Sequence, residues 1–376
     1  MNFIPVCVPY LPGNEKKYVL DALNTNWISS AGTYLDKFEE EFSKFCGSTY
    51  GVSCANGFAA LHLACIAIGL QKGDEVIVPT FTMSAPVNAV ILTGATPVFV
   101  DADKETFCID AEKIEKKITR KTKAIIAVHI YGHMAAMNKI MHLAKKYDLK
   151  VIEDAAEAHG AEYHDKKAGS IGDIGCFSFY ANKILTTGEG GMCITNNKDY
   201  AEKMKKIRNY AFEHPRFLHR EFGLNYRLTN LQAAIGLAQT ENAALLVEAR
   251  KKIGEKYNAL LKGIQGIILP IEKQNCKNVF WMYGVLLKKS IKAKREQILL
   301  ELKEKGIDTR TFFIPMHRQP VFLSRKIENG PDCSGKYSIA DYIGKRGLYL
   351  PSSSNLTDKE LLYIAEALKE ILKKYL

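Results

Sequence analysis

The sequence contains no apolar stretch that approaches the roughly 20 residues a helix needs to cross a membrane. Its first residues, MNFIPVCVPY, lack the basic segment of a targeting leader. Nine cysteines are present, but none forms a CxxC pair, so we expect reduced thiols. These absences predict a soluble cytoplasmic protein that has neither a membrane segment nor a metal site.

Nucleotide-binding signatures are also missing, because the sequence has neither a Walker A motif nor GxGxxG. The charge is less decisive: 52 Lys and Arg against 41 Asp and Glu give a net charge of +11. The lysines are spread along segments with helical spacing, such as EKIEKKITRKTK (112–123). We therefore expect a solvated basic surface and no nucleic-acid partner. The positive electrostatic field of such a surface would also favour a small substrate that carries phosphate.

The sequence does contain short apolar, β-branched runs that alternate with amphipathic segments. This alternation predicts an α/β domain with a mostly parallel, buried sheet. After about residue 196 the pattern changes, with one long helical span over 228–261 interrupted only by Gly236. We predict a large domain over 1–245 and a smaller C-terminal α/β domain over 246–376. The expected strands are 50–54, 75–79, 96–100, 124–130, 150–155, 175–179 and 191–195.

Three polar features fall where strands of such a sheet end, which is where ligands bind. Asp154 ends one buried strand, and Lys183 lies four residues past another. Asn56 and Gly57 form a turn from a strand into a helix, a place where free N–H groups can bind an anion. Each feature has an ordinary alternative: a helix N-cap for Asp154, a surface charge for Lys183, and a simple turn at Asn56.

Together the three features match the needs of one cofactor. A buried lysine amine has a lowered pKa and can form a Schiff base. A carboxylate can pair with a pyridinium nitrogen, and a glycine turn at a helix start can bind a phosphate. Lysine, acid and anion site in one sheet therefore point to pyridoxal 5'-phosphate (PLP).

Ordered motifs along nearly the whole chain resemble the DegT/StrS group of PLP-dependent sugar aminotransferases. The resemblance implies the fold-type I PLP-dependent transferase architecture, with a seven-stranded, mostly parallel sheet in the large domain. The motifs are NWISSAG (26–32), GDEVIVPTFT (73–82), GATPVFVD (94–101), VIEDAAEAHGA (151–161), FSFYANKILTTGEGGM (177–192), GLNYRLTNLQAAIGLAQ (223–239), FWMY (280–283) and PMHRQPVF (315–322).

The resemblance also implies roles for individual residues. Lys183 would bond to the cofactor and Asp154 would keep its ring nitrogen protonated, while Glu157 would lie near its phenolic oxygen. Ser178 and the backbone at Gly57 would bind its phosphate. Asn225 would reach the phosphate from a neighbouring subunit, which requires a homodimer with a shared active site. Residues expected to line a sugar-nucleotide pocket are Trp27, Ser29, Ser30, Tyr180 and His317.

Two positions depart from the group's pattern. Phe58 stands where a threonine usually follows the glycine turn, so a hydroxyl contact to the phosphate is lost while the backbone N–H remains. Met83 stands where an aromatic side chain usually stacks on the ring, and a thioether can still cover a ring face. Both changes bear on cofactor packing and leave the Lys183 and Asp154 pair untouched.

The reaction implied is transamination of a nucleotide-linked 4-keto-6-deoxyhexose with L-glutamate as amino donor, for surface polysaccharide of the O-antigen type. The expected substrate is GDP-4-keto-6-deoxy-D-mannose, which would give GDP-perosamine by amination at C4. Open alternatives are amination at C3, a dTDP- or UDP-linked keto sugar, and PLP-dependent dehydration. Dehydratases of this kind resemble the group with His in place of the lysine, so Lys183 argues against dehydration. A non-catalytic DNA- or partner-binding scaffold is disfavoured by the intact Lys, Asp and Ser set.

Overall fold

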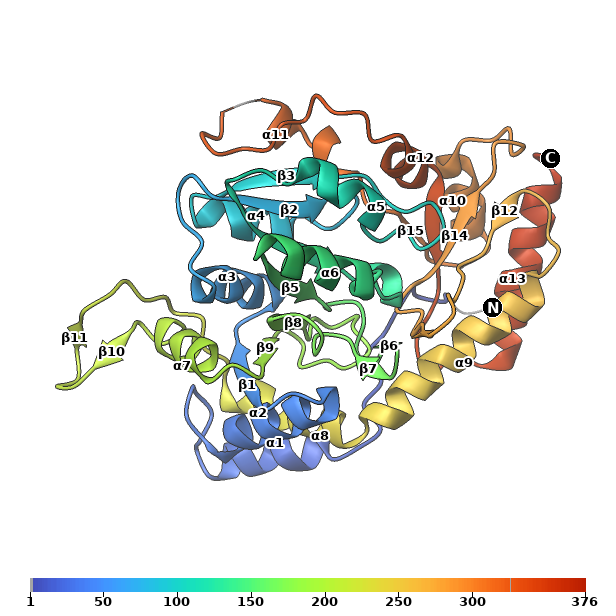
Figure 1. Cartoon of the computed structure of the whole chain (residues 1–376). Coiled ribbons are helices and arrows are strands. Elements are labelled where there is room, and N and C mark those ends of the chain that lie inside the picture. The colour runs from blue at the N-terminus through green and yellow to red at the C-terminus, as the bar shows by residue number, and fades with distance from the viewer. Residues whose placement is uncertain (1–2, 325) are drawn as a thin grey trace.

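The computed structural model describes residues 3–324 and 326–376. Its main element is a seven-stranded sheet with the strand order β1-β9-β8-β5-β4-β2-β3 (Figure 1). Strand β9 is antiparallel to β1 and β8, and the neighbouring pairs from β8 to β3 are all parallel. The strands are β1 (Tyr50–Cys54), β2 (Glu75–Pro79), β3 (Thr96–Val100), β4 (Thr122–Val128), β5 (Lys150–Asp154), β8 (Ile174–Ser178) and β9 (Gly191–Thr195). The predicted fold class is confirmed, and each predicted apolar run supplies one strand.

Helices cover this sheet because its strands are apolar on both faces. Helix α3 packs on β5, β8 and β9, while α6 packs on β4 and β5. Helices α1, α2 and α8 pack together beside β1, at the bottom of Figure 1. The helices of this part are α1 (Glu15–Asn24), α2 (Thr33–Cys46), α3 (Gly57–Ala67), α4 (Ala85–Leu92), α5 (Ala111–Ile114), α6 (Met137–Tyr147), α7 (Lys198–Ile207) and α8 (Asn230–Glu241).

A second core lies in the C-terminal part of the chain, around an antiparallel sheet ordered β12-β14-β16-β15. Its strands are β12 (Ile267–Ile268), β14 (Tyr283–Leu287), β15 (Arg310–Thr311) and β16 (Gly347–Leu350). Its helices are α9 (Ala243–Leu261), α10 (Arg295–Glu304), α11 (Pro320–Leu323), α12 (Ser338–Arg346) and α13 (Asp358–Lys373). Ile4 also packs in this core, so the chain crosses between the two parts near its start as well as after α8.

Smaller sheets and turns complete the described chain. One arm carries the hairpin β10 (Phe212–Glu213) and β11 (Leu218–His219), which projects from the body at the left of Figure 1. A three-stranded sheet joins β13 (Cys276–Lys277), β6 (Glu162–Tyr163) and β7 (Lys166–Lys167). The short 3-10 helices are η1 (Glu115–Lys117), η2 (Ile130–Gly132) and η3 (Met316–Arg318). Among residues 3–324 and 326–376 we find no helix with the length and apolar character of a membrane span.

The helical span predicted over 228–261 forms two helices, and the interruption predicted at Gly236 is wrong. Helix α8 ends at Glu241, and α9 begins at Ala243 after Asn242, whose side-chain amide donates to Ala238 O at 3.0 Å. Gly236 does not interrupt the helix. It lies inside α8, where an added Cβ would come within 2.7 Å of the Phe38 ring of α2. The glycine therefore serves close helix packing, which periodicity alone does not reveal.

A buried carboxylate fastens β5 to the loop that leads into β8. Glu153 accepts hydrogen bonds from the N–H groups of Ile171 and Gly172, both at 2.6 Å, and from Gly169 N at 3.1 Å. His129 Nε2 lies 2.8 Å from the same carboxylate. Burial alone would raise the pKa of Glu153, but His129 and the backbone donors lower it. The charge is therefore held by donors of the protein itself.

We predict that Glu153→Gln destabilises the protein by about 3 kcal/mol, because an amide cannot accept from all these donors and leaves buried N–H groups unpaired. Urea unfolding of the variant measures this loss. The exposed Glu112→Gln change is the matched control and should stay within about 0.5 kcal/mol of wild type. Equal losses in the two variants would contradict the structural role given to Glu153.

Candidate active site

Most of the residues predicted to bind the cofactor meet at the carboxyl edge of the large sheet, as expected for parallel strands. Asp154 ends β5 and Ser178 ends β8, and the two strands are neighbours. The turn after β1 carries Asn56, and the loop after β2 carries Met83. These segments enclose a cavity of about 440 Å³, a volume typical of cofactor sites. Its wall includes Asn56, Gly57, Phe58, Met83, Asp154, Glu157, Ser178, Tyr180 and Lys183.

Lys183 lies in the turn after β8, where its N–H donates to Tyr180 O at 2.9 Å. Burial lowers the pKa of its amine, while Glu157 and Asp154 act in the opposite direction. In the part of the chain that the structure describes, the amine has no hydrogen-bond or ion-pair partner. Its contact is the ring of Trp281, whose centroid is 3.7 Å from Nζ. The amine thus lies in the cavity wall without a hydrogen-bond acceptor among the described residues.

The two acids of the cavity are buried and weakly compensated. Among the described residues Asp154 accepts one hydrogen bond, from Ala156 N at 3.1 Å, and burial raises the pKa of its carboxyl. Glu157 accepts from Tyr131 N at 2.8 Å, and burial raises its pKa to about 7. Residues 155–160 form turns, so Asp154 is not the N-cap of a following helix. A buried carboxylate in this state is suited to a cationic partner, such as a protonated ring nitrogen.

A small anion cup lies beside these groups at the start of α3. The Asn56 side chain caps the helix by accepting from Ala59 N at 2.9 Å. Within the described chain, the N–H groups of Gly57 and Phe58 in the first turn have no protein acceptor. Glycine is required here, because a Cβ at Gly57 would come within 2.7 Å of the Ser178 Cβ. Glycine is also required at Gly191, the first residue of β9, because a Cβ there would meet Asn56 O at 2.2 Å.

These features fit PLP. The cup presents free N–H groups and the Ser178 hydroxyl at the positive end of a helix, as a phosphate requires. The buried Asp154 carboxylate and the unpaired Lys183 amine face the same cavity. Phe58 and Met83, the two departures from the group's pattern, both lie on its wall, and Met83 is 53% exposed at the mouth. The residues present can therefore hold the phosphate, the ring nitrogen and the reactive carbon of this cofactor.

Residues 9–369 match the DegT/DnrJ/EryC1/StrS aminotransferase family, and the chain belongs to this family. Aminotransferases of the family are PLP-dependent and act on sugars. The resemblance drawn from the ordered motifs is thereby confirmed.

Individual relatives match over nearly their full length. A GDP-perosamine synthase of Escherichia coli O157:H7 is 42% identical over 372 residues, which cover 98% of this chain and 99% of the relative. A GDP-perosamine synthase of Caulobacter vibrioides is 43% identical over 371 residues, 98% of each chain. The PLP form of Spr1654, a putative sugar aminotransferase from Streptococcus pneumoniae, superimposes with a TM-score of 0.93 at 26% identity and covers 100% of both chains.

Some predicted site residues lie outside the cavity of this chain. The backbone carbonyls of Trp27 and Ser29, in the loop before α2, bond to Asn230 at the start of α8. Ser30 belongs to the same loop. Asn225 is exposed at the base of the arm, where its side-chain oxygen accepts from Arg227 Nε at 3.0 Å. The roles given to these residues stay predictions.

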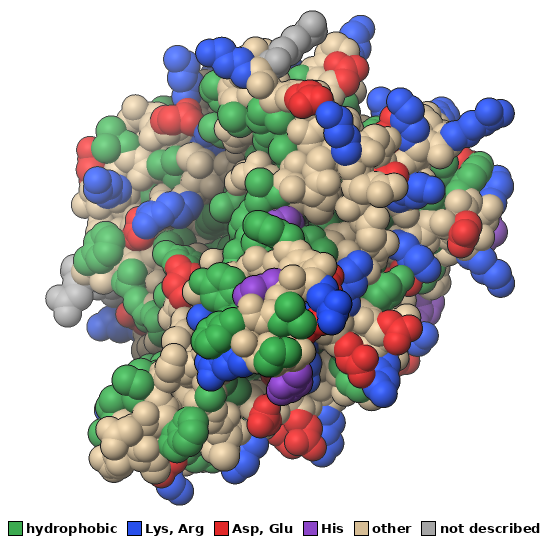
Figure 2. All heavy atoms as spheres, turned by 90° about the vertical axis from the view of Figure 1, so that its left-hand side faces the viewer, with side chains coloured by type: hydrophobic (Ala, Val, Ile, Leu, Met, Phe, Trp, Pro, Cys, Tyr) green, Lys and Arg blue, Asp and Glu red, His purple; other side chains and the backbone are tan. Residues whose placement is uncertain are grey.

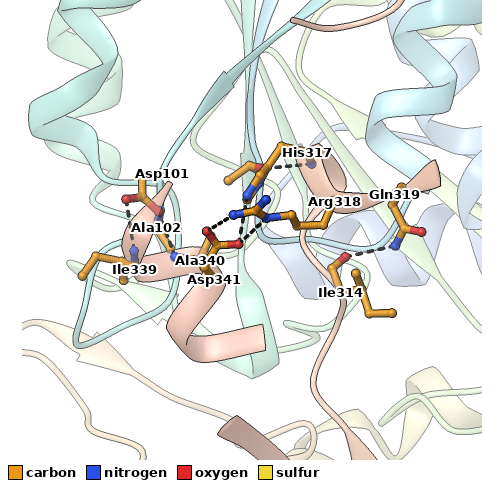
Figure 3. A network of polar contacts seen from close by, with 10 residues as sticks. Asp101, Ala102, Ile314, His317, Arg318, Gln319, Ile339, Ala340 and Asp341 are labelled. Carbon is orange, nitrogen blue, oxygen red and sulfur yellow. Dashed lines mark hydrogen bonds and ion pairs between the residues drawn. The ribbon is translucent and has the colours of Figure 1, made fainter. Parts of the chain in front are cut away.

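His317 is only 2% exposed and takes part in a network between the two parts of the molecule (Figure 3). Its Nδ1 lies 2.7 Å from Thr80 Oγ1, and its Nε2 lies 3.0 Å from Asp341 of α12. Arg318 also bonds to Asp341, and Asp101 accepts from the first N–H groups of α12. In this arrangement His317 holds the segment 315–319 against the end of β2, so its predicted contact with a sugar nucleotide stays a prediction.

Sequence reasoning also missed members of the cavity wall. The FWMY motif contains Trp281, and the PTFT motif contains Thr82, yet neither was assigned a role. Both motifs were visible, but an aromatic residue in a motif is more often part of the packing. Asn182, Glu189 and Phe313 line the cavity too, and only the tertiary structure identifies them.

The pKa of Glu157 gives a testable pH dependence of stability. Because the folded state raises this pKa to about 7, it binds the proton more tightly than the unfolded chain does. The contribution of Glu157 to stability therefore falls as pH rises from about 4.3, the unfolded value, toward 7. For the cofactor-free chain, we expect the stability of wild type relative to Glu157→Gln to decrease over this window, on the order of 2–3 kcal/mol.

Urea unfolding at a series of pH values measures this difference. For the exposed Glu112→Gln variant, the free energy of unfolding should change with pH in the same way as that of wild type. Parallel curves for Glu157→Gln as well would show that Glu157 titrates normally in the folded protein.

Proposed function

We propose that this protein is a PLP-dependent aminotransferase that converts GDP-4-keto-6-deoxy-D-mannose to GDP-perosamine with L-glutamate as amino donor, in the synthesis of O-antigen-type surface polysaccharide. The observation that carries the proposal is the meeting of Lys183, Asp154 and the Gly57–Ser178 cup in one cavity. The nucleotide sugar is proposed from the relatives named GDP-perosamine synthase that match over nearly the whole chain.

Each residue would have a defined part. PLP, when bound, withdraws electrons from the carbon that loses its proton. Asp154 would keep a proton on the ring nitrogen, and Ser178 with the first N–H groups of α3 would hold the phosphate. Lys183 Nζ, whose pKa burial lowers, could take a proton from the donor's α-carbon and later deliver one to C4 of the sugar. The overall exchange balances without an outside oxidant or reductant: the α-carbon of glutamate is oxidised by two electrons to a keto carbon, and C4 of the sugar is reduced by two electrons to a carbon that carries the amino group.

The sugar nucleotide is too large to share the cavity with the cofactor, so it would extend outward. An apolar groove of about 670 Å³ adjoins the cavity and shares Phe58, Thr82, Met83 and Phe313 with it. Figure 2 shows the side of the molecule that bears the arm and α4, where hydrophobic side chains surround a hollow with basic side chains nearby.

A homodimer is part of the proposal. The arm projects from the body and exposes two aromatic side chains, Phe217 by 69% and Phe222 by 85% (Figure 1). Large exposed aromatics on a projecting segment are typical of an interaction surface. Asn225 follows them at the base of the arm and is accessible to a second copy. We propose that each arm places Asn225 at the partner's phosphate cup.

The first test is spectroscopic. We expect the protein with PLP to show a visible absorbance band that L-glutamate bleaches and that GDP-4-keto-6-deoxy-D-mannose restores. Lys183→Ala should lose the lysine-dependent band and about 10²- to 10⁴-fold in turnover, because it removes the proton-transferring amine. The exposed Lys252→Ala variant is the matched control and should behave as wild type.

Other outcomes of this test have definite meanings. A band that ignores glutamate would overturn aminotransfer. Better restoration by a dTDP- or UDP-linked keto sugar would correct the nucleotide, and NMR of the product would show an amine at C3 or a lost hydroxyl if the reaction differs.

The shared site is tested by mixing variants. Lys183→Ala and Asn225→Ala are each expected to be impaired alone, whereas refolding them together should restore activity in about a quarter of the sites, since random pairing makes half of the dimers mixed with one intact site each. Two Lys183→Ala preparations mixed in the same way give the baseline. No gain in the mixed sample, or a monomer by analytical ultracentrifugation, would contradict the shared site.

A further inference from the structure

The ε-amino group of Lys183 lies over the face of an indole. Its Nζ is 3.7 Å from the centroid of the Trp281 ring, well inside the roughly 6 Å range of cation–π attraction. The two neighbouring acids do not replace the indole ring as the partner of the amine. Asp154 bonds to Ala156 N and Glu157 to Tyr131 N, and within the described residues neither forms an ion pair with the amine. The indole face is therefore the contact that locates this amine.

The same indole also holds the backbone of Lys183. Trp281 Nε1–H donates to Asn182 O at 3.0 Å. This carbonyl belongs to the peptide unit that carries the Lys183 N–H, so the indole contacts both ends of the lysine. One flat side chain thus sets the position of the peptide and of the amine together.

Trp281 is itself fixed from three directions. The Trp281 side chain is buried, with 4% of the residue exposed, and its backbone N–H donates to Tyr131 O at 3.1 Å. Its carbonyl accepts from the guanidinium of Arg250, a buried residue of α9. Gly132 allows this close approach, because a Cβ there would come within 2.9 Å of Trp281 N. Because these contacts fix the backbone and the Asn182 hydrogen bond fixes the buried ring, the indole loses little further freedom when it receives the amine.

We propose that Trp281 is a positioning residue for Lys183: its indole face holds the protonated ε-amino group whenever the amine is not bonded to another group, and its Nε1–H fixes the peptide that carries the lysine. The inference rests on the proposed function only in taking Lys183 as the reactive amine. It adds a residue of the C-terminal part to a site otherwise built mostly on the large sheet.

The proposal has a consequence for proton binding. Burial lowers the pKa of Lys183, and an indole face that stabilises the ammonium opposes this effect. Removal of the face should therefore lower the pKa further. The titratable and charged groups around the amine and its indole are Cys7, Asp154, Glu157, His159, Glu189 and Arg250.

Tryptophan fluorescence tests the contact without altering residue 281. The chain has two tryptophans, so Trp27→Phe leaves Trp281 as the only tryptophan, and excitation beyond the tyrosine absorption band selects it. In the full-length, cofactor-free chain, we expect the emission of Trp281 to change with pH as Lys183 titrates. Adding Lys183→Met to the same background should abolish that transition. A transition that survives Lys183→Met would overturn the contact.

Trace acetylation followed by peptide mass spectrometry tests the consequence, because the pH dependence of labelling gives the pKa of each lysine. We expect the pKa of Lys183 to fall from wild type to Trp281→Phe, which keeps a weaker ring face, and further to Trp281→Leu, by about half a unit to one and a half units in total. The matched control Trp27→Leu should leave the pKa of Lys183 unchanged.

An unchanged or higher pKa in Trp281→Leu would overturn the proposal, and a higher value would mean that the indole only excludes water. If Trp281→Leu does not unfold cooperatively, Trp281→Phe and the fluorescence titration decide the question. Both measurements use the cofactor-free chain, so failure of the glutamate or keto-sugar assay would leave their outcome unaffected.

Discussion

The backbone of Tyr131 is the junction on which the active site depends. Its N–H donates to Glu157 of the large part, and its carbonyl accepts from Trp281 of the C-terminal part. To do both, Tyr131 takes a left-handed conformation with φ of 52° and is followed by Gly132 with φ of 94°. Such a conformation costs on the order of 1–3 kcal/mol and persists only where surrounding contacts impose it. The wall around Lys183 exists because the C-terminal part of the chain enters the core of the large sheet at this turn, through Trp281.

The end of β5 and the turn that follows it show how one stretch of chain can carry both structural and reactive acids. Glu153 is surrounded by donors of the protein, and its pKa is lowered despite burial. Asp154 and Glu157 are equally buried but receive one backbone N–H each within the described chain, and their pKa values are raised. A carboxylate that the protein satisfies has nothing left to offer a ligand, whereas one that it leaves short of donors is prepared for a cation. The number of donors, not the degree of burial, separates the two roles.

The large sheet and the lysine–acid pair were predictable from local patterns. Apolar β-branched runs specify buried parallel strands, and parallel strands bring Asp154 and Ser178 to the same edge. The interruption of the helical span over 228–261 was misplaced because Asn242 gives only a weak stop signal, while Gly236 looks like a break and is in fact a packing contact with Phe38. His317 stood in a recognisable motif, yet no pattern in the sequence indicates its pairing with Thr80 and Asp341.

By itself, therefore, the sequence determined the α/β class, the positions of the strands along the chain, and the family to which the chain belongs, because these depend on periodicity and on ordered motifs. Only the tertiary structure decided which groups face Lys183. Trp281 lies 98 residues further along the chain than Lys183. Its ring reaches the amine because Gly132 and Arg250 hold the Trp281 backbone in place. Trp281 packs in the core of the large sheet, whereas Phe280 and Tyr283 pack in the C-terminal core, and such a change of core between neighbouring residues leaves no periodic trace in the sequence.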